Sequence, residues 1–489
     1  MRRKLLFGSA VLLTLGSVAC SNPPEAQEVA DLTASRSADM VRGMGNGMRM
    51  MSEMSSMQSL GDSATLLQGA FSEVPLTGAP SCPPEGCDGP TAGPTTPGVP
   101  DPTVTDAQAA LLEKYLRERV FTEATVEATD GDSTLFRLMG EDLCTTGSAP
   151  ADPVCVAEVD RMELRVRATR SGEKGLNLEL LIGPERAGPV TLRFEPKSVA
   201  VVMDLSGAKA ALVFLNPEAA QSLPKVMAGQ LELRLTENGP QDLTFSTAIL
   251  GDIRVELDAS GATHAFTTAK TNPLSSLRME GPAKRATFEL NLGATEYRGP
   301  YQSAAAELAG KEMVLSLSGL SFAFSAEEGK EDFVVAHVGL GEAQSYVSLD
   351  GTKLFTADLN ALSGRHFDLN LSRGADGLPL VRVLPEFDLV TRFFLQPLKV
   401  DATASVPPFY EDETYRVRLS GGGTPSLRPV PGDETTGFPG GLRVVSGELS
   451  LEAGGTAVTV PAGSCLVGKD VAAEGAHPLL GHFEASACP

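Results

Sequence analysis

The chain has 489 residues, of which 42% are hydrophobic, 5% are aromatic and none is Trp, and its formal net charge at pH 7 is −22. An acidic surface repels phosphate backbones, and so few aromatic rings leave little on which bases could stack, so the composition argues against a nucleic-acid-binding protein. The length and the apolar content allow two or three domains with a substantial core.

The N-terminus has the pattern of an export signal. Three basic residues at positions 2–4 are followed by an apolar stretch, 5–18, that ends shortly before Cys20. This stretch is too short to cross a bilayer as a lasting span, and no other run of eighteen apolar residues exists in the chain. We therefore expect residues 1–19 to be a signal peptide and the mature protein to be exported.

The stretch LGSVAC, which ends at Cys20, resembles the lipobox of bacterial lipoproteins. Val18 and Ala19 match the lipobox pattern as well, whereas Ser17 stands where leucine is usual. In that family the cysteine is acylated and becomes the new N-terminus, so the resemblance implies a lipid anchor at Cys20. Ordinary signal cleavage after Ala19 is the alternative. By the same resemblance, Ser21 after the cysteine is compatible with sorting to the outer membrane.

The cysteine count favours acylation, because it leaves an even number of thiols. With Cys20 acylated, the remaining six fall into couples that are close in sequence: Cys82 and Cys87, Cys144 and Cys155, Cys465 and Cys488. In an exported chain this pattern is typical of disulfides, and we expect one bond within each couple, although six cysteines allow fifteen connectivities. Zinc binding is the weaker alternative, because no CxxC pair is present and the five histidines are scattered.

Residues 20–105 are expected to form a lipid-anchored tether. Helix is predicted between residues 30 and 71, with methionines at helical spacing: Met40, Met44, Met48, Met51, Met54 and Met57. Such a stripe packs as an adaptable apolar surface or binds Cu(I) through its sulfur atoms. Packing is favoured, because no His or Cys lies among the methionines. Residues 76–105, rich in Pro, Gly and Thr, predict a linker without a core.

A helix followed by a large β domain is expected over residues 106–405. Thr105 and Gln108 occupy capping-box positions of a helix over 105–121, which has apolar residues at every fourth position. Strict alternation of apolar and polar residues then predicts half-buried strands. The clearest of these strands are 162–166, 231–235, 288–292 and 367–371.

Three later stretches predict hairpin turns, because Asp and Gly lie between alternating apolar residues. They are Asp204 with Gly207, Asp258 with Gly261 and Asp350 with Gly351, and Asn216, Asn272 and Asn360 follow the second strand of each. We interpret the stretches as copies of one unit, with an insertion at 299–331 that carries a strand pair of its own (313–324). Chance similarity between hairpins is the alternative.

The alternation also assigns the two faces of these strands, since a slip by one residue would reverse every side chain. The side chains expected inside are Leu231, Leu233, Leu235, Ile253, Val255, Leu257, Val347 and Leu349. Those expected outside are Glu232, Arg234, Arg254, Glu256 and Ser348. Burial of an unpaired charge would cost several kcal/mol, so this pattern should be enforced.

Residues 406–489 read as a Pro/Gly-rich link and a small β module closed by Cys465 and Cys488. The whole chain therefore predicts a mainly β fold: antiparallel repeated strand-hairpin units forming a curled sheet, a sandwich or a partly closed barrel. A large sheet with one apolar face is expected to fold over on itself in water.

No motif for catalysis, metal or cofactor binding is recognisable, so we expect a protein that is not an enzyme and has no metal or cofactor. Residues 61–63 (GDS) resemble the nucleophile block of GDS-type esterases, but the chain has no late Asp-x-x-His. Asp130 and Asp132 lack the further carboxylates of a calcium loop. Three histidines lie in or near predicted strands and two lie near the C-terminus: His264, His337, His366, His477 and His482.

Two functions remain open. The first is a non-enzymatic scaffold or interaction protein of the cell envelope, anchored to the outer membrane through Cys20, with a protein partner and no nucleic acid. The second is a carrier of lipid or another apolar ligand in a curled sheet, which resembles bacterial lipoprotein-carrier half-barrels in this general sense. Apolar faces that meet each other would favour the first, and an unfilled apolar cavity would favour the second.

Overall fold

The computed structural model describes residues 23–55, 110, 113–139, 163–183, 187–259, 261–301, 309–327, 332–341, 345–361, 366–373, 379–384, 387–393, 413–421, 424–430, 432–433, 435–438, 440–469, 477 and 480–489. The chain forms two compact units, residues 1–42 with 102–220 and residues 43–101 with 221–489. Both are mainly β, and the strand pairs within the described residues are antiparallel, so the predicted mainly β, antiparallel fold class is confirmed.

The first unit contains a six-stranded sheet in which each strand pairs with the next along the chain. Its strands are β1 (Val126–Asp130), β2 (Ser133–Met139), β3 (Glu163–Ser171), β4 (Gly175–Ile182), β5 (Ala187–Glu195) and β6 (Ser198–Asp204). The helix expected before it ends as a π-helical turn, η1 (Leu116–Val120), and a 3-10 turn, η2 (Glu123–Thr125), follows. The capping-box residues expected at its start lie outside the part of the chain that is described.

Helix α2 (Ala26–Ser55) contributes to the core of the first unit through its N-terminal half. Val29 and Ala30 are fully buried in a cluster with Phe136, which meets Phe121 edge to face at 5.2 Å between ring centroids. Met40 packs against the same cluster. The start of the expected tether is therefore a core helix, and the first methionine of its stripe packs against protein. The side chains of the stripe beyond Met40 lie outside the described residues.

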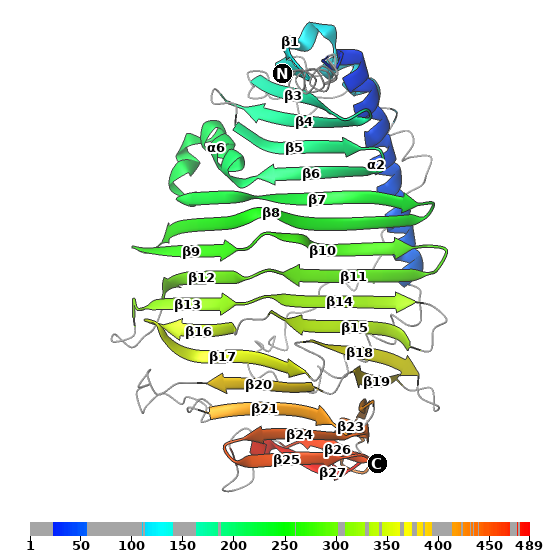
Figure 1. Ribbon diagram of the computed structural model, residues 1–489, viewed down its shortest axis with the longest axis vertical. Helices are drawn as coiled ribbons and strands as arrows, with labels where there is room; N and C mark the ends of the chain where they lie inside the picture. The colour runs from blue at the N-terminus through cyan, green and yellow to red at the C-terminus, as the bar shows by residue number, and fades with distance from the viewer. Residues whose placement is uncertain are drawn as a thin grey trace, which may run out of the picture. The chain divides into compact units, whose positions relative to one another are not determined.

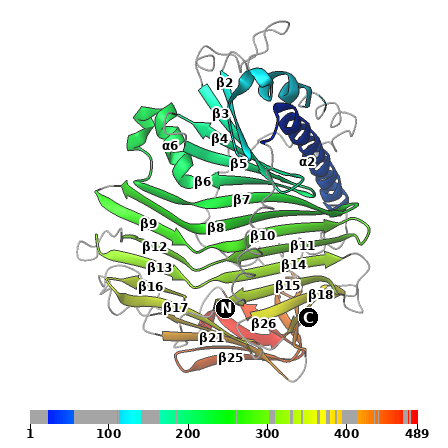
Figure 2. The ribbon, with the colours of Figure 1, turned by 45° about the horizontal axis from the view of Figure 1, so that its top comes forward.

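The hairpin predicted at Asp204 is wrong. Asp204 ends β6 and is the N-cap of helix α6 (Leu205–Leu215), where its carboxylate accepts a hydrogen bond of 2.7 Å from the N–H of Gly207. The following residues, AKAALVFL, include good helix formers, and a capped start allows them to form helix in place of a second strand. The 3-10 turn η4 (Pro217–Gln221) comes next. Figure 2 shows α6 beside β5.

The two other predicted hairpins are correct. Asp258 lies at the end of β8 (Asp242–Ala259) and accepts a hydrogen bond from Thr263 of the next strand. Asp350 and Gly351 form a tight turn with φ of +46° and +78°, as a primed hairpin turn requires. Because Asp204 caps a helix, however, the three stretches are not copies of one unit, and the repeat hypothesis fails.

The second unit begins with two long strands, β7 (Val226–Gly239) and β8. Beyond β8 the sheet continues as two strips, one paired to each half of β8 (Figure 1). Strip A contains β9 (Ala262–Thr268), β12 (Thr295–Pro300), β13 (Glu312–Leu317), β16 (Ser345–Leu349), β17 (Thr352–Ala361), β20 (Phe387–Phe393), β21 (Glu413–Ser420), β24 (Glu448–Ala453) and β25 (Thr456–Pro461). Strip B contains β10 (Thr271–Glu280), β11 (Arg285–Leu292), β14 (Leu320–Glu327), β15 (Asp332–Leu340), β18 (His366–Arg373), β19 (Pro379–Leu384), β22 (Ser426–Val430), β23 (Gly441–Ser446), β26 (Ser464–Gly468) and β27 (Phe483–Ala487).

On each pass the chain contributes one strand to strip A and one to strip B. In the first passes after β8 the two strands form one long strand with a break in its middle. Figure 1 shows β9 and β10 end to end, and β12 with β11 and β13 with β14 in the same relation. The strand pair predicted at 313–324 is therefore wrong: β13 pairs with β12 and β16, whereas β14 pairs with β11 and β15. The alternating residues of 313–324 therefore belong to two strands that follow one another along the same pass, and the chain does not reverse direction between them.

Glycines occupy several of these breaks and let neighbouring backbones approach. Gly421 has φ of +132° and lies so close to the next pass that a Cβ atom there would be 2.6 Å from the Cα of Gly447. Gly447 has φ of +85°, and a Cβ atom there would be 2.7 Å from the carbonyl oxygen of Ser420. Only glycine combines these backbone conformations with such close contact.

The apolar sides of the two strips pack together at the C-terminal end. Leu419, Leu449 and Val460 of strip A and Val444 of strip B form one buried cluster. The disulfide between Cys465 on β26 and Cys488 lies at this end, as the cysteine spacing predicted. Closure of its loop contributes about 3 kcal/mol in the chain-entropy model. The C-terminal strands continue the sheet, since β21 pairs with β20 along its whole length.

We expect Gly421→Ala to lower the free energy of unfolding by about 2–4 kcal/mol, because it adds a steric overlap to the cost of a positive φ. Urea unfolding followed by circular dichroism measures the change. Gly437→Ala is the matched control: Gly437 also has a positive φ, +69°, but a Cβ there would meet nothing within 4 Å. Equal destabilisation by the two variants would contradict the close approach at the break.

Candidate functional site

One face of strip A carries an apolar row that runs across neighbouring strands. The backbone register places Val255 of β8 opposite Phe266, Phe266 opposite Tyr297, Tyr297 opposite Leu315, and Leu315 opposite Val347. Adjacent strands lie about 4.8 Å apart, so these side chains touch their neighbours and form a continuous surface.

This surface is largely uncovered. Phe266 and Leu315 are each 40% exposed, and Leu257, two positions along β8 from Val255, is 39% exposed. We call Leu257, Phe266, Tyr297 and Leu315 the apolar patch. The same side of the sheet is fully covered at the C-terminal end, where Leu419 and Val460 have no exposed surface. The patch is therefore the open part of a face that is closed elsewhere in the second unit.

The face assignments made from the sequence are partly wrong. Leu233, expected inside, is 58% exposed, and Glu232, expected outside, is 6% exposed. The period of two is correct, but the alternation does not reveal which face a second layer covers. Glu232 is buried without being unpaired, because Arg234 on the same side donates two hydrogen bonds to its carboxylate, of 2.9 and 3.2 Å.

In β8 and β16, the other two strands whose faces were assigned, the alternation again predicts burial only in part. Ile253 is buried as expected, but Leu257 on the same side is not. Leu349 is buried, and so is Ser348, which was expected outside. The pairing of β16 with β17 shifts register between Val347 and Ser348, so strict alternation ends there.

A histidine and a tyrosine form a hydrogen-bonded pair on the open face. His264 lies opposite Leu257 on β8, and its Nδ1 atom is 2.8 Å from the hydroxyl of Tyr297. Gly299 makes room for this contact, because a Cβ atom there would lie 2.4 Å from the tyrosine hydroxyl. Both rings are half-buried, so the pair places polar atoms in the middle of an apolar surface.

Two pairs of hydroxyl groups lie on the same side of neighbouring strands. Thr247 and Ser275 are 2.7 Å apart, and Thr268 and Thr295 are 2.8 Å apart, each pair directly opposite in the register. Each hydroxyl therefore has a partner within the sheet, which reduces the cost of placing it on an apolar face. In contrast, Nε2 of His264 has no hydrogen-bond partner among the residues that the structure describes.

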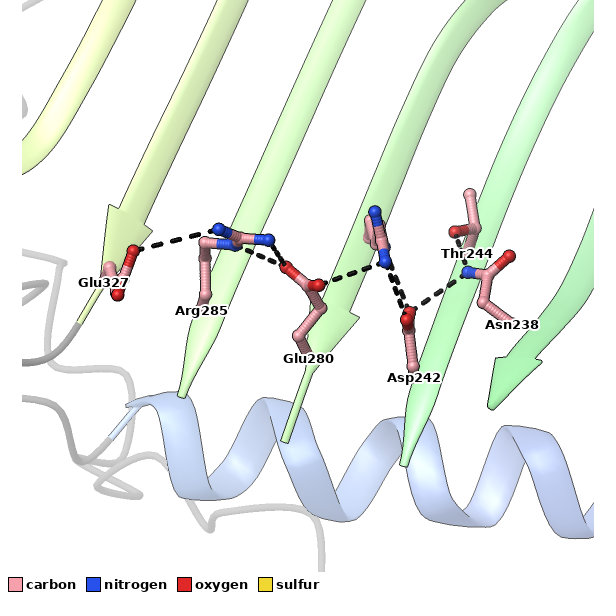
Figure 3. A network of polar contacts seen from close by, with 7 residues as sticks. Asn238, Asp242, Thr244, Glu280, Arg285 and Glu327 are labelled. Atoms are coloured by element: carbon pink, nitrogen blue, oxygen red, sulfur yellow. Dashed lines mark hydrogen bonds and ion pairs between the residues drawn. The ribbon is translucent and has the colours of Figure 1, made fainter. Parts of the chain in front are cut away.

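Charged side chains form a ladder across β7, β8 and the first strands of strip B, on their polar face (Figure 3). Arg278 binds Asp242 with two hydrogen bonds, of 2.7 and 3.1 Å, and lies 3.0 Å from Glu280. Glu280 also accepts a hydrogen bond from Arg285, which reaches Glu327 at 3.9 Å. Asn238 and Thr244 extend the ladder at its opposite end, where Asn238 donates to both Asp242 and Thr244.

The hydrogen bonds of the ladder shift the pKa values of several of its side chains. The hydrogen bond from Arg278 lowers the pKa of Asp242, and the same bond raises the pKa of Arg278. Hydrogen bonding to Glu280 likewise raises the pKa of Arg285. These shifts favour the charged forms of Asp242, Arg278 and Arg285, so the ladder connects neighbouring strands through ion pairs.

A second uncovered apolar surface lies on the first unit. Three side chains in the last turn of α6, Leu212, Phe214 and Leu215, are each about half-exposed. Phe214 lies over Gly183, where a Cβ atom would come within 2.9 Å of the ring. We call these three side chains the α6 surface.

Several other candidate residues from the sequence have structural partners, whereas the side chain of His366 lies outside the described residues. His337 lies 2.6 Å from Asp368 across a strand pair, the N–H of Leu480 donates to His477, and Nδ1 of His482 lies 3.0 Å from the carbonyl of Lys469. The peptide carbonyl of Asp130, at the β1–β2 turn, accepts a hydrogen bond from Ser133. No group of three metal-ligating side chains is found within the described residues.

Several predicted sites fall outside the described residues and stay predictions. These are the anchor Cys20, the disulfides Cys82–Cys87 and Cys144–Cys155, and the segment 61–63. The His264–Tyr297 pair was missed as a pair, because its members are 33 residues apart and meet only through the register of β9 with β12.

Comparison with known proteins gives no relative: no family model, no curated protein and no solved structure matches the chain. No helix within the described residues is both long and apolar enough to cross a membrane.

We expect Asp242→Asn to lower the free energy of unfolding at neutral pH, because the two hydrogen bonds from Arg278 are then made to an uncharged group. The lowered pKa of Asp242 means that the unfolded chain binds its proton first as the pH falls. The difference between variant and wild type is therefore full above the ordinary value of 3.8, shrinks below it and vanishes below the lowered pKa.

Urea unfolding at several pH values measures this dependence. Glu237→Gln is the control, since Glu237 is exposed and makes no ion pair within the described part of β7 and its neighbours. A difference between Asp242→Asn and wild type that persists unchanged at the lowest pH would contradict the assigned role of the ladder.

Proposed function

We propose that this protein is an exported, lipid-anchored protein of the bacterial cell envelope that holds an apolar ligand, a lipid acyl chain, on the apolar patch. The observation that carries the proposal is the exposure of Leu257, Phe266 and Leu315 together on one face of the sheet. Contiguous exposed apolar surface with polar surroundings is typical of binding sites.

The energetics favour a covered patch. Full burial of a Leu or Phe side chain contributes about 1.5–3 kcal/mol, so covering Leu257, Phe266 and Leu315, which are 39–40% exposed, would contribute on the order of 2–3 kcal/mol from the protein side alone. An acyl chain would bury its own surface in addition. The C-terminal end of the same face supports this interpretation, because there the protein covers its apolar side chains itself.

A second function, interaction with a protein partner of the envelope, is favoured by the α6 surface. Three half-exposed apolar side chains on the last turn of a helix are a suitable anchor for such a partner. The α6 surface and the apolar patch belong to different units.

For ligand binding, we expect the protein to enhance the fluorescence of the neutral apolar probe 1-N-phenylnaphthylamine, and palmitate to displace the probe. Phe266→Asn should weaken probe binding about tenfold, because the largest apolar side chain of the patch is lost. Thr267→Asn, the next residue of β9 on the opposite face, is the matched control and should bind as the wild type does. Equal binding by both variants and the wild type would refute the patch as the site.

For the anchor, we expect Cys20→Ser to move the protein from the detergent phase to the aqueous phase in a Triton X-114 partition of expressing cells. Acylation of the cysteine with two chains gives stable membrane attachment, and the serine hydroxyl cannot replace the thiol in the lipobox. Cys465→Ser, which breaks the disulfide near the other end of the sequence and leaves the signal unchanged, is the control. Unchanged partitioning of Cys20→Ser would exclude the lipid anchor.

A further inference from the structure

We propose that the His264–Tyr297 pair binds the carboxylate of the ligand, so that the site is selective for long-chain carboxylic acids over neutral apolar molecules. This inference rests on the proposed function, because the same patch must hold the acyl chain. It adds what the patch alone does not indicate, namely the chemistry of the polar end of the ligand.

The position of the pair is the first argument. Tyr297 lies between Phe266 and Leu315 in the register, and His264 lies opposite Leu257, so the two rings sit among the three exposed apolar side chains. A ligand that covers the patch must therefore contact these polar atoms. An amphiphile satisfies both requirements when its chain lies on the apolar side chains and its head lies at the pair.

The hydrogen-bonding capacity of the pair is the second argument. If the tyrosine hydroxyl donates to Nδ1 of His264, the ring proton lies on Nε2, which becomes a donor. If Nδ1 donates to the tyrosine oxygen instead, the hydroxyl of Tyr297 becomes the donor, and the doubly protonated ring offers both. The pair thus presents at least one donor in every protonation state, which suits an acceptor-only group such as a carboxylate.

The arrangement of charges is the third argument. Carboxylates on the strands of the patch could repel an anion, but they alternate with the patch residues and lie on the opposite face. They are Glu256 and Asp258 of β8, Glu296 of β12 and Glu312 of β13. Arg298 and Arg254 lie on that face as well, where they pair with Glu296 and Glu256. Among the described residues of β9, β12, β13 and the half of β8 that pairs with β9, His264 is therefore the group on the open face that can carry a positive charge to meet the ligand.

The strength of the contact favours an ionised head over a neutral one. Hydrogen bonds to a charged acceptor are roughly twice as strong as those between neutral groups. A hydroxyl or ester at the end of the same chain would gain less from the pair, while its chain would gain as much from the patch.

The test compares palmitate with hexadecanol, which has the same chain length and a neutral head, as competitors of 1-N-phenylnaphthylamine on the full-length protein. His264→Leu should weaken palmitate about tenfold or more and change hexadecanol less than about threefold, since only the charged head loses its donor. Tyr297→Phe keeps the ring, removes only the hydroxyl and should weaken palmitate about three- to tenfold. His337→Leu, a paired histidine outside the patch, is the control and should leave both competitors unchanged.

The outcomes separate this inference from the proposed function. If both amphiphiles displace the probe and His264→Leu and Tyr297→Phe weaken them equally or not at all, the carboxylate contact is refuted while apolar binding stands. If neither amphiphile displaces the probe from the wild type, or the probe does not bind, both the carboxylate contact and the proposed function are refuted. Selective loss of palmitate in the two variants supports both.

Discussion

The lateral backbone hydrogen bonds of the antiparallel sheet are the constraint on which the architecture of the second unit depends. In an antiparallel sheet, directly opposite residues point to the same face, so the face of one side chain determines the face of its partner on the next strand. This is why Val255, Phe266, Tyr297, Leu315 and Val347 form one row although each lies on a different strand. The same rule sends the carboxylates and arginines of these strands to the opposite side.

The two faces are stabilised in different ways. On the polar face, cross-strand ion pairs such as Arg278 with Asp242 and Arg416 with Asp388 connect neighbouring strands. On the apolar face, stability depends on a partner surface, which strips A and B supply for each other around Val444 and Leu449. Around Phe266 the apolar face is exposed and has no such partner surface within the described residues.

Local patterns in the sequence were sufficient to predict the class of fold and many strands. The alternations at 231–235, 288–292 and 367–371 all lie in strands, and the turns at Asp258 and Asp350 are hairpins. The turn predicted at Asp204 was wrong because Asp is favoured both in tight turns and at helix N-caps, and the residues that follow decide between them.

What the sequence could not provide is information carried by distant pairing. Alternation shows that Glu232 and Leu233 point to opposite faces, but the covered face depends on which strands lie against it. The contact of His264 with Tyr297 likewise depends on the register of strands that are not consecutive in the chain. Gly299, two residues after Tyr297, is the glycine that makes room for this contact. A glycine in a strand can equally mark a bulge or a bend, so its presence in the sequence does not predict the contact.

Beyond β8 the two strips are paired separately, which has a consequence for how the sheet tolerates insertions and deletions. In an unbroken strand, one added residue would turn every later side chain to the wrong face. In two of the passes the halves are separated at Gly421, which follows β21, and at Gly447, which lies between β23 and β24, and these two glycines hold neighbouring passes in close contact. A shift of register within one strip therefore need not be carried into the other, whereas a residue added at these glycines would disrupt their close contact.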